Sequence, residues 1–66
     1  MEKITVAEAM QKLMHKEIYL TELYFYVDGV GYLQTDEMFI SGDIVLHNLA
    51  TDEETEVSGE DYIYLF

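Results

Sequence analysis

The sequence predicts an α+β domain in which one N-terminal helix packs on an antiparallel sheet of four to five short strands. A helix-capping pattern followed by an apolar repeat of helical period opens the chain. The remainder consists of short segments rich in β-branched and aromatic residues, separated by turns that contain glycine. With 66 residues, half of them hydrophobic, the chain has enough material for a single domain over residues 1–66.

The helix is expected at about residues 5–16. Thr5 and Glu8 have the spacing of a capping box, with Thr5 as the N-cap. Ala9 suits a helix and is assigned to its solvated flank. The apolar residues that recur at helical spacing should form one stripe facing the sheet: Val6, Met10, Leu13 and Met14.

Strands are expected from Ile18 onward, where β-branched and aromatic residues become frequent. The first covers residues 18–27, and Asp28-Gly29 then predicts a tight hairpin turn. The second covers residues 32–40, and any interruption of it is expected near Thr35. The same composition predicts three further strands, at 44–49, 54–57 and 61–66. Turns are expected at 41–43 and 58–60, where glycine and polar residues occur together.

The charge of the chain is strongly asymmetric. Fourteen acidic residues face three basic ones, for a net charge of −11. All three bases, Lys3, Lys12 and Lys16, precede residue 17, and residues 17–66 hold twelve acids without any Lys or Arg. Such a segment cannot neutralise itself, so its field projects outward. We expect no direct nucleic-acid binding, because neutralising phosphates requires Lys or Arg.

Two interpretations of this charge remain open, a solubilising surface or a surface that meets a basic partner. The absence of any base after Lys16 favours the second. On an extended strand, same-face side chains repeat at roughly 6.6 Å, so Asp52, Glu54 and Glu56 would form a carboxylate row comparable to phosphates along one nucleic-acid strand. The candidate partner-binding residues are the acids of the predicted turns and strands: Asp28, Asp36, Glu37, Asp43, Asp52, Glu53, Glu54, Glu56, Glu60 and Asp61.

Neither a metal site nor a catalytic site is predicted. A calcium loop that begins at Asp52 would need glycine at its sixth position and glutamate at its twelfth, where the chain has Val57 and Ile63. The two histidines, His15 and His47, have no partner at metal-ligand spacing, and cysteine is absent. No glycine-rich phosphate loop or nucleophile motif occurs. We therefore expect a protein without enzymatic activity and without a cofactor.

The sequence also bears on location and oligomeric state. No apolar run approaches the ~20 residues that a membrane-spanning helix needs, and the N-terminus lacks the pattern of a signal peptide. We expect no membrane association and a cytoplasmic location. Six tyrosines and three phenylalanines are many for one small core. For most of the tyrosines we expect a place at the edge of the core with the hydroxyl in water. Because tyrosine is also enriched in interface cores, a homodimer that uses a Tyr-rich sheet face is the alternative functional prediction, with the acids serving only solubility.

In size, lack of arginine, acid excess after Glu17 and α+β pattern, the chain resembles the small acidic DNA-mimic proteins encoded by phages and other mobile elements. The resemblance covers the whole chain in character and involves no shared motif, so it transfers no functional residue. It implies a host-takeover inhibitor that acts in the cytoplasm of the host cell. Such a protein would present carboxylates to a basic DNA-binding host protein, with an HU-type nucleoid protein favoured.

Overall fold

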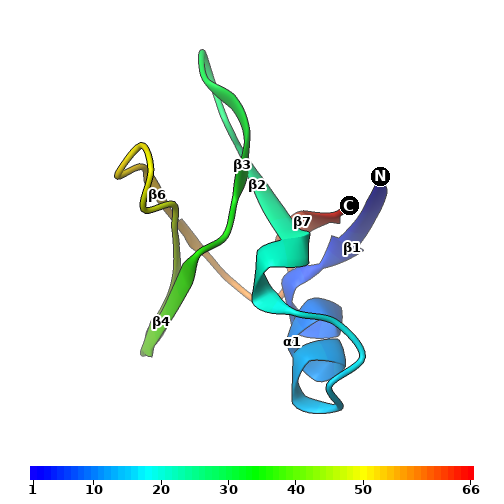
Figure 1. The fold of residues 1–66 in the computed structure, drawn as a ribbon. Helices are drawn as coiled ribbons and strands as arrows, with labels where there is room; N and C mark the ends of the chain where they lie inside the picture. The colour runs from blue at the N-terminus through cyan, green and yellow to red at the C-terminus, as the bar shows by residue number, and fades with distance from the viewer.

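The computed structural model describes all of residues 1–66 and contains one α-helix, one short 3-10 helix and seven strands (Figure 1). The α+β class is confirmed, but the expected single sheet is wrong. The strands form two antiparallel sheets, a first sheet in the order β1-β7-β2-β3 and a second in the order β4-β5-β6. The elements along the chain are β1 (Glu2–Thr5), α1 (Val6–Met14), η1 (Leu20–Glu22), β2 (Leu23–Val27), β3 (Gly31–Gln34), β4 (Glu37–Ser41), β5 (Asp43–His47), β6 (Glu54–Val57) and β7 (Tyr62–Leu65).

Helix α1 begins where the capping pattern predicts. The Thr5 hydroxyl accepts a hydrogen bond from the Glu8 backbone N–H at 3.1 Å. The expected apolar stripe is wrong at two positions, because Ala9 is buried whereas Met14 is 76% exposed. Met14 lies eight residues beyond Val6, which rotates it by about 80° from that residue, so the stripe ends at Leu13. Helix α1 has nine residues, and no helix in the protein is long and apolar enough to span a bilayer.

The first sheet contains a strand that the sequence patterns missed. Strand β1 pairs with β7 so that Ile4 lies opposite Ile63, which brings the two ends of the chain together. The expected strand over 18–27 is also shorter, beginning only at Leu23. Residues 20–22 turn into a 3-10 helix instead, where the Tyr19 backbone N–H donates to the Glu22 carboxylate at 2.6 Å. The first difference arises from a pairing between the two ends of the chain, whereas the second arises from a local capping box at Tyr19 and Glu22 that the strand-like composition concealed.

The strand expected over 32–40 breaks at Thr35 and Asp36, and its two halves join different sheets. The Thr35 backbone N–H donates to the carbonyl of Leu23 in the first sheet at 2.8 Å. The next backbone N–H, that of Asp36, donates to the carbonyl of His47 in the second sheet at 2.9 Å. Thr35 is fully buried at this junction, and its hydroxyl has no hydrogen-bond partner.

The core is formed by the inward-facing side chains of both sheets and of α1. The other face of each sheet points away from this core. Helix α1 packs against β1 and β7 of the first sheet, while β5 of the second sheet contributes Leu46 to the same core. Partly buried residues of the second sheet, including Met38 and Val57, pack against it. Because side chains alternate along a strand, the residues between these positions point away from the core. The buried cluster comprises Ile4, Val6, Ala9, Leu23, Phe25, Leu46 and Ile63.

Candidate functional site

The outer face of the second sheet gathers carboxylates from β4, β6 and the β5–β6 loop around a histidine of β5. On β4 and β5, Glu37 lies opposite His47, which on its other side lies opposite Glu54 of β6. Directly paired residues of antiparallel strands project to the same side, so these three form one row across the sheet. In the next row Glu56 lies opposite Val45. We define the acidic face as Glu37, Asp52, Glu54 and Glu56 together with His47.

His47 is the centre of the acidic face. Its Nε2 lies 2.8 Å from Oδ1 of Asp52, and its Nδ1 lies 3.2 Å from Oε1 of Glu37. The hydrogen bond to Asp52, and after it the one to Glu37, raises the pKa of His47 above its ordinary value, because both favour the charged imidazolium. The negative charges of Asp52 and Glu54 act in the same direction. His47, whose side chain is only 13% exposed, is the one group on this face that becomes cationic when protonated.

Asn48 fixes the loop that brings Asp52 to this face. Its amide Nδ2 donates to the carbonyl of Gln34 at 2.8 Å, and its Oδ1 accepts from the Thr51 backbone N–H at 2.9 Å. The loop is closed further by the Asp52 backbone N–H, which donates to the Asn48 carbonyl at 2.9 Å. Asp52 adopts a left-handed conformation with φ of 61°, which Asp tolerates better than most residues.

Sequence reasoning missed Asn48 because it lay inside the strand expected over 44–49. The strand β5 ends at His47, and Asn48 instead begins a side-chain-supported turn. The local signal was weak, since Asn favours turns supported by its side chain but the next two residues, Leu49 and Ala50, are apolar. A buried amide that joins two sheets through Gln34 could be identified only from the structure.

The predicted carboxylate row is confirmed for two of its three members. Glu54 and Glu56 are both exposed on the same side of β6, where Thr55 and Val57 alternate with them toward the core. Asp52 precedes the strand and is not extended, so its place in a regular row is wrong. Its carboxylate reaches the acidic face through its contact with His47.

The remaining candidate acids either accept hydrogen bonds that stabilise turns or lie outside the acidic face. Asp36 accepts hydrogen bonds from the Gln34 side chain at 2.9 Å and from the Leu49 backbone N–H at 2.8 Å, and Asp61 accepts one from the Ser58 backbone N–H at 2.8 Å. These carboxylates stabilise turns and junctions. Others lie away from the acidic face or at its margin: Asp28 in the β2–β3 turn, Glu60 in the β6–β7 turn, Asp43 at the β4–β5 end of the second sheet, and Glu53, half-buried in the β5–β6 loop.

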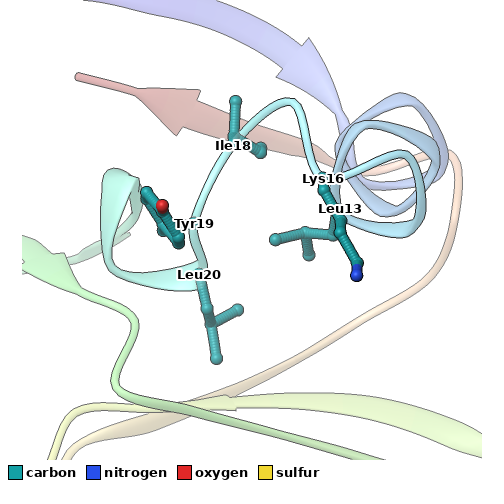
Figure 2. Close-up of a pocket in the computed structure, with 5 residues that line it drawn as sticks. All are labelled: Leu13, Lys16, Ile18, Tyr19 and Leu20. Carbon is teal, nitrogen blue, oxygen red and sulfur yellow. The ribbon is translucent and has the colours of Figure 1, made fainter.

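A hollow of about 420 Å³ lies elsewhere, between the end of α1 and the segment that leads to β2. Figure 2 shows Leu13 and Lys16 on one side of it, facing Tyr19 and Leu20, with Ile18 as the fifth lining residue. The lining is mainly apolar and includes no carboxylate or imidazole that could form an acid–base pair with Lys16. No group of three or more His, Cys, Asp or Glu residues in the chain is placed to hold a metal ion.

The acidic face can accept hydrogen bonds and ion pairs from a partner. Its carboxylates are suited to the ammonium and guanidinium groups of Lys and Arg, which bind carboxylates through charge-assisted hydrogen bonds. Comparison of the chain with protein-family models, curated proteins and solved structures finds no match.

Proposed function

We propose that this protein is a phage-encoded inhibitor that binds a basic DNA-binding protein of the host through the acidic face and thereby blocks its DNA binding. An HU-type nucleoid protein is the favoured partner. The observation that supports this proposal is the gathering of four carboxylates on one sheet face, while every lysine lies on β1, on α1 or directly after α1. A basic partner therefore meets four carboxylates that surround His47 on this face.

The physical reason is that carboxylates and phosphates recruit the same side chains. Both present anionic oxygen acceptors, so the Lys and Arg residues with which a protein binds DNA can also bind a carboxylate array. Long-range attraction by a net charge of −11 would speed association and make it strongly dependent on salt. Binding at this face and binding of DNA would then be mutually exclusive.

The proposal is tested by competition between the protein and a DNA duplex for a purified HU-type protein. Fluorescence anisotropy of labelled duplex should show displacement by the wild type at 50 mM NaCl. The double reversal E54K/E56K should weaken this displacement by at least ~100-fold, since two central attractions become repulsions. Both positions are exposed on β6, so the fold should be retained.

A matched control distinguishes an effect of the acidic face from an effect of the net charge. The variant E2K/E17K changes net charge by the same amount at two exposed positions outside the acidic face. It should weaken displacement by less than about 5-fold, because the distant charges are largely screened. Equal losses in the two variants would show that only total charge matters, and the absence of any displacement by the wild type would exclude this partner.

A second candidate function is a dimeric interaction module in which the acids serve only solubility. Exposed aromatic side chains on the first sheet, including Tyr26, Tyr32 and Tyr62, favour it. Under this alternative, E54K/E56K would capture the same cellular partner as the wild type, whereas changes to the exposed tyrosines would abolish capture.

A further inference from the structure

The outer face of the first sheet is mainly aromatic. Tyr24 lies opposite Tyr64 across β2 and β7, and Tyr26 lies opposite Tyr32 across β2 and β3. Four of the side chains on this face remain between 44 and 58% exposed, which is unusual for rings of this size. We define the aromatic face as Tyr24, Tyr26, Tyr32, Tyr62, Tyr64 and Phe66.

The rings on this face hold one another in place. Tyr32 is central, with its ring centroid 5.1 Å from that of Tyr26, 5.0 Å from that of Tyr64 and 5.8 Å from that of Phe66. All three contacts are edge-to-face, and Phe66 makes a similar contact with Tyr24 at 4.5 Å. Because the rings are already ordered, a partner that covers them loses little conformational entropy on binding.

The charge of the surrounding surface indicates what can cover this face. The four strands of the first sheet contain a single carboxylate, Glu2, which alternates with Lys3 and therefore points to the other side. Lys3 lies on the aromatic face, with its ammonium 4.5 Å from the centroid of the Tyr62 ring. In a chain with fourteen acids, the strands of this face present no carboxylate to a second copy, and the nearest one, Asp36, lies at the margin and is bound by the Gln34 side chain at 2.9 Å.

A single-stranded nucleic acid could also stack bases on tyrosines, but its phosphates would enter the field of a protein with a net charge of −11. A second copy of the chain would present the same aromatic rings and, from the strands of this face, no carboxylate. We propose that the aromatic face joins two copies of this chain in a two-fold symmetric homodimer. In such a dimer the aromatic face of one copy packs against the aromatic face of the other.

The available area is compatible with a reversible dimer. With roughly 200 Å² for each aromatic side chain, the four half-exposed rings alone present about 400 Å². The more buried Tyr24 and Tyr64, with Lys3 and Gln34 at the margin, extend this toward the ~800 Å² that each partner contributes to a standard interface. Since the aromatic and acidic faces belong to different sheets, the dimer would leave two acidic faces free. This inference is independent of the function proposed for the acidic face.

The dimer has a salt dependence opposite to that of a complex with a basic partner. Two chains of net charge −11 repel each other, and salt screens that repulsion while leaving apolar burial intact. Sedimentation velocity between about 5 μM and 1 mM protein should give a dimer dissociation constant in the micromolar range. This constant should fall by about 3- to 10-fold as NaCl is raised from 50 to 500 mM.

Substitutions then locate the interface. Y32E places a carboxylate at the centre of the aromatic face and should raise the dimer dissociation constant by at least ~100-fold. K3E places one at its margin without removing a ring and should raise it by about 10-fold. Y19E is the matched control, because Tyr19 is 79% exposed but lies outside this face. The dimer dissociation constant of Y19E should stay within about 3-fold of the wild-type value. Circular dichroism checks that each variant is folded.

Several results would overturn the inference. One is a chain that remains monomeric at 1 mM in 500 mM NaCl, and another is equal weakening by Y32E and Y19E. Binding of an oligothymidylate probe that Y32E abolishes would instead assign the face to single-stranded nucleic acid. Because no basic protein is present in these measurements, their failure is distinguishable from failure of the function proposed for the acidic face.

Discussion

The outer faces of the two sheets are built by the same alternation of side chains but carry opposite chemistry. In the first sheet the outward positions of β2 and β3 hold Tyr24, Tyr26 and Tyr32, whereas in the second the outward positions of β4 and β6 include Glu37 and Glu54. Both sheets use their inner positions for one shared core. A chain of 66 residues can therefore offer two separate surfaces, because each sheet buries only one face.

The largest expected difference between the two faces is their response to salt. Raising NaCl from 50 to 300 mM should weaken binding of an HU-type protein by about 100-fold, because several screened charge pairs hold that complex. Over the same range, self-association should become tighter, because repulsion between the two acidic chains is screened. Titration calorimetry for the partner and sedimentation for the dimer measure the two trends. Parallel trends would contradict the assignment of different chemistry to the two faces.

Loss of the Asn48 amide should affect the acidic face more than the aromatic face. N48A removes three side-chain hydrogen bonds and leaves the half-buried carbonyl of Gln34 without this partner. We expect the free energy of unfolding in urea to fall by about 2 kcal/mol. Partner affinity should fall by about 10-fold as Asp52 loses its fixed position, while the dimer dissociation constant stays unchanged.

The control for this experiment is T51A, which removes one hydroxyl from the same loop but keeps Asn48 in place. T51A should lower the free energy of unfolding by about 1 kcal/mol or less. If N48A lowers stability without changing partner affinity, Asp52 does not contribute to binding.

His47 should give the acidic face a pH dependence that the aromatic face lacks. Its pKa is raised in the folded protein, mainly by the hydrogen bonds to Asp52 and Glu37, so its stabilising contribution is complete below pH 6.5 and is lost as pH rises through the folded pKa. Partner affinity should change in the opposite direction and rise several-fold between pH 6 and 8.5, because deprotonation removes the only cation from the face.

The variant H47Q should reduce both of these pH dependences, as measured by urea unfolding and by partner titration at each pH. H15Q is the matched control, since the His15 side chain is 70% exposed and lies at the end of α1, outside both faces. A pH profile for H47Q that matches the wild type would show that His47 does not control the charge of the face.

The smallest expected effect concerns the junction that separates the two faces. T35V replaces a fully buried hydroxyl without a hydrogen-bond partner by a methyl group of similar shape. The free energy of unfolding should rise by about 1 kcal/mol, with no change at either face. T35A, which leaves a small cavity at the same site, should lower it by about 1 kcal/mol. Destabilisation by T35V would indicate that the hydroxyl is hydrogen-bonded in solution.

Local patterns predicted those features that depend on neighbouring residues. The Thr5 cap, the Asp28-Gly29 turn and the same-face placement of Glu54 and Glu56 are all confirmed. Each depends on backbone preferences or on the two-residue repeat of a strand, which operate over a few positions. The same reasoning misassigned Met14 and Ala9, because the helix direction that faces the core is set by the sheet beneath it.

By itself, the sequence determined the α+β class, the helix cap, most turns and the charge asymmetry, since these follow from local conformation and from composition. Only the tertiary structure decided that the chain divides into two sheets at Thr35 and Asp36, because consecutive backbone groups there find partners distant in sequence. It also decided which acids gather around His47 and which stabilise turns. The separation of carboxylates from tyrosines onto different faces depends on strand pairing across the whole chain, which no short segment encodes.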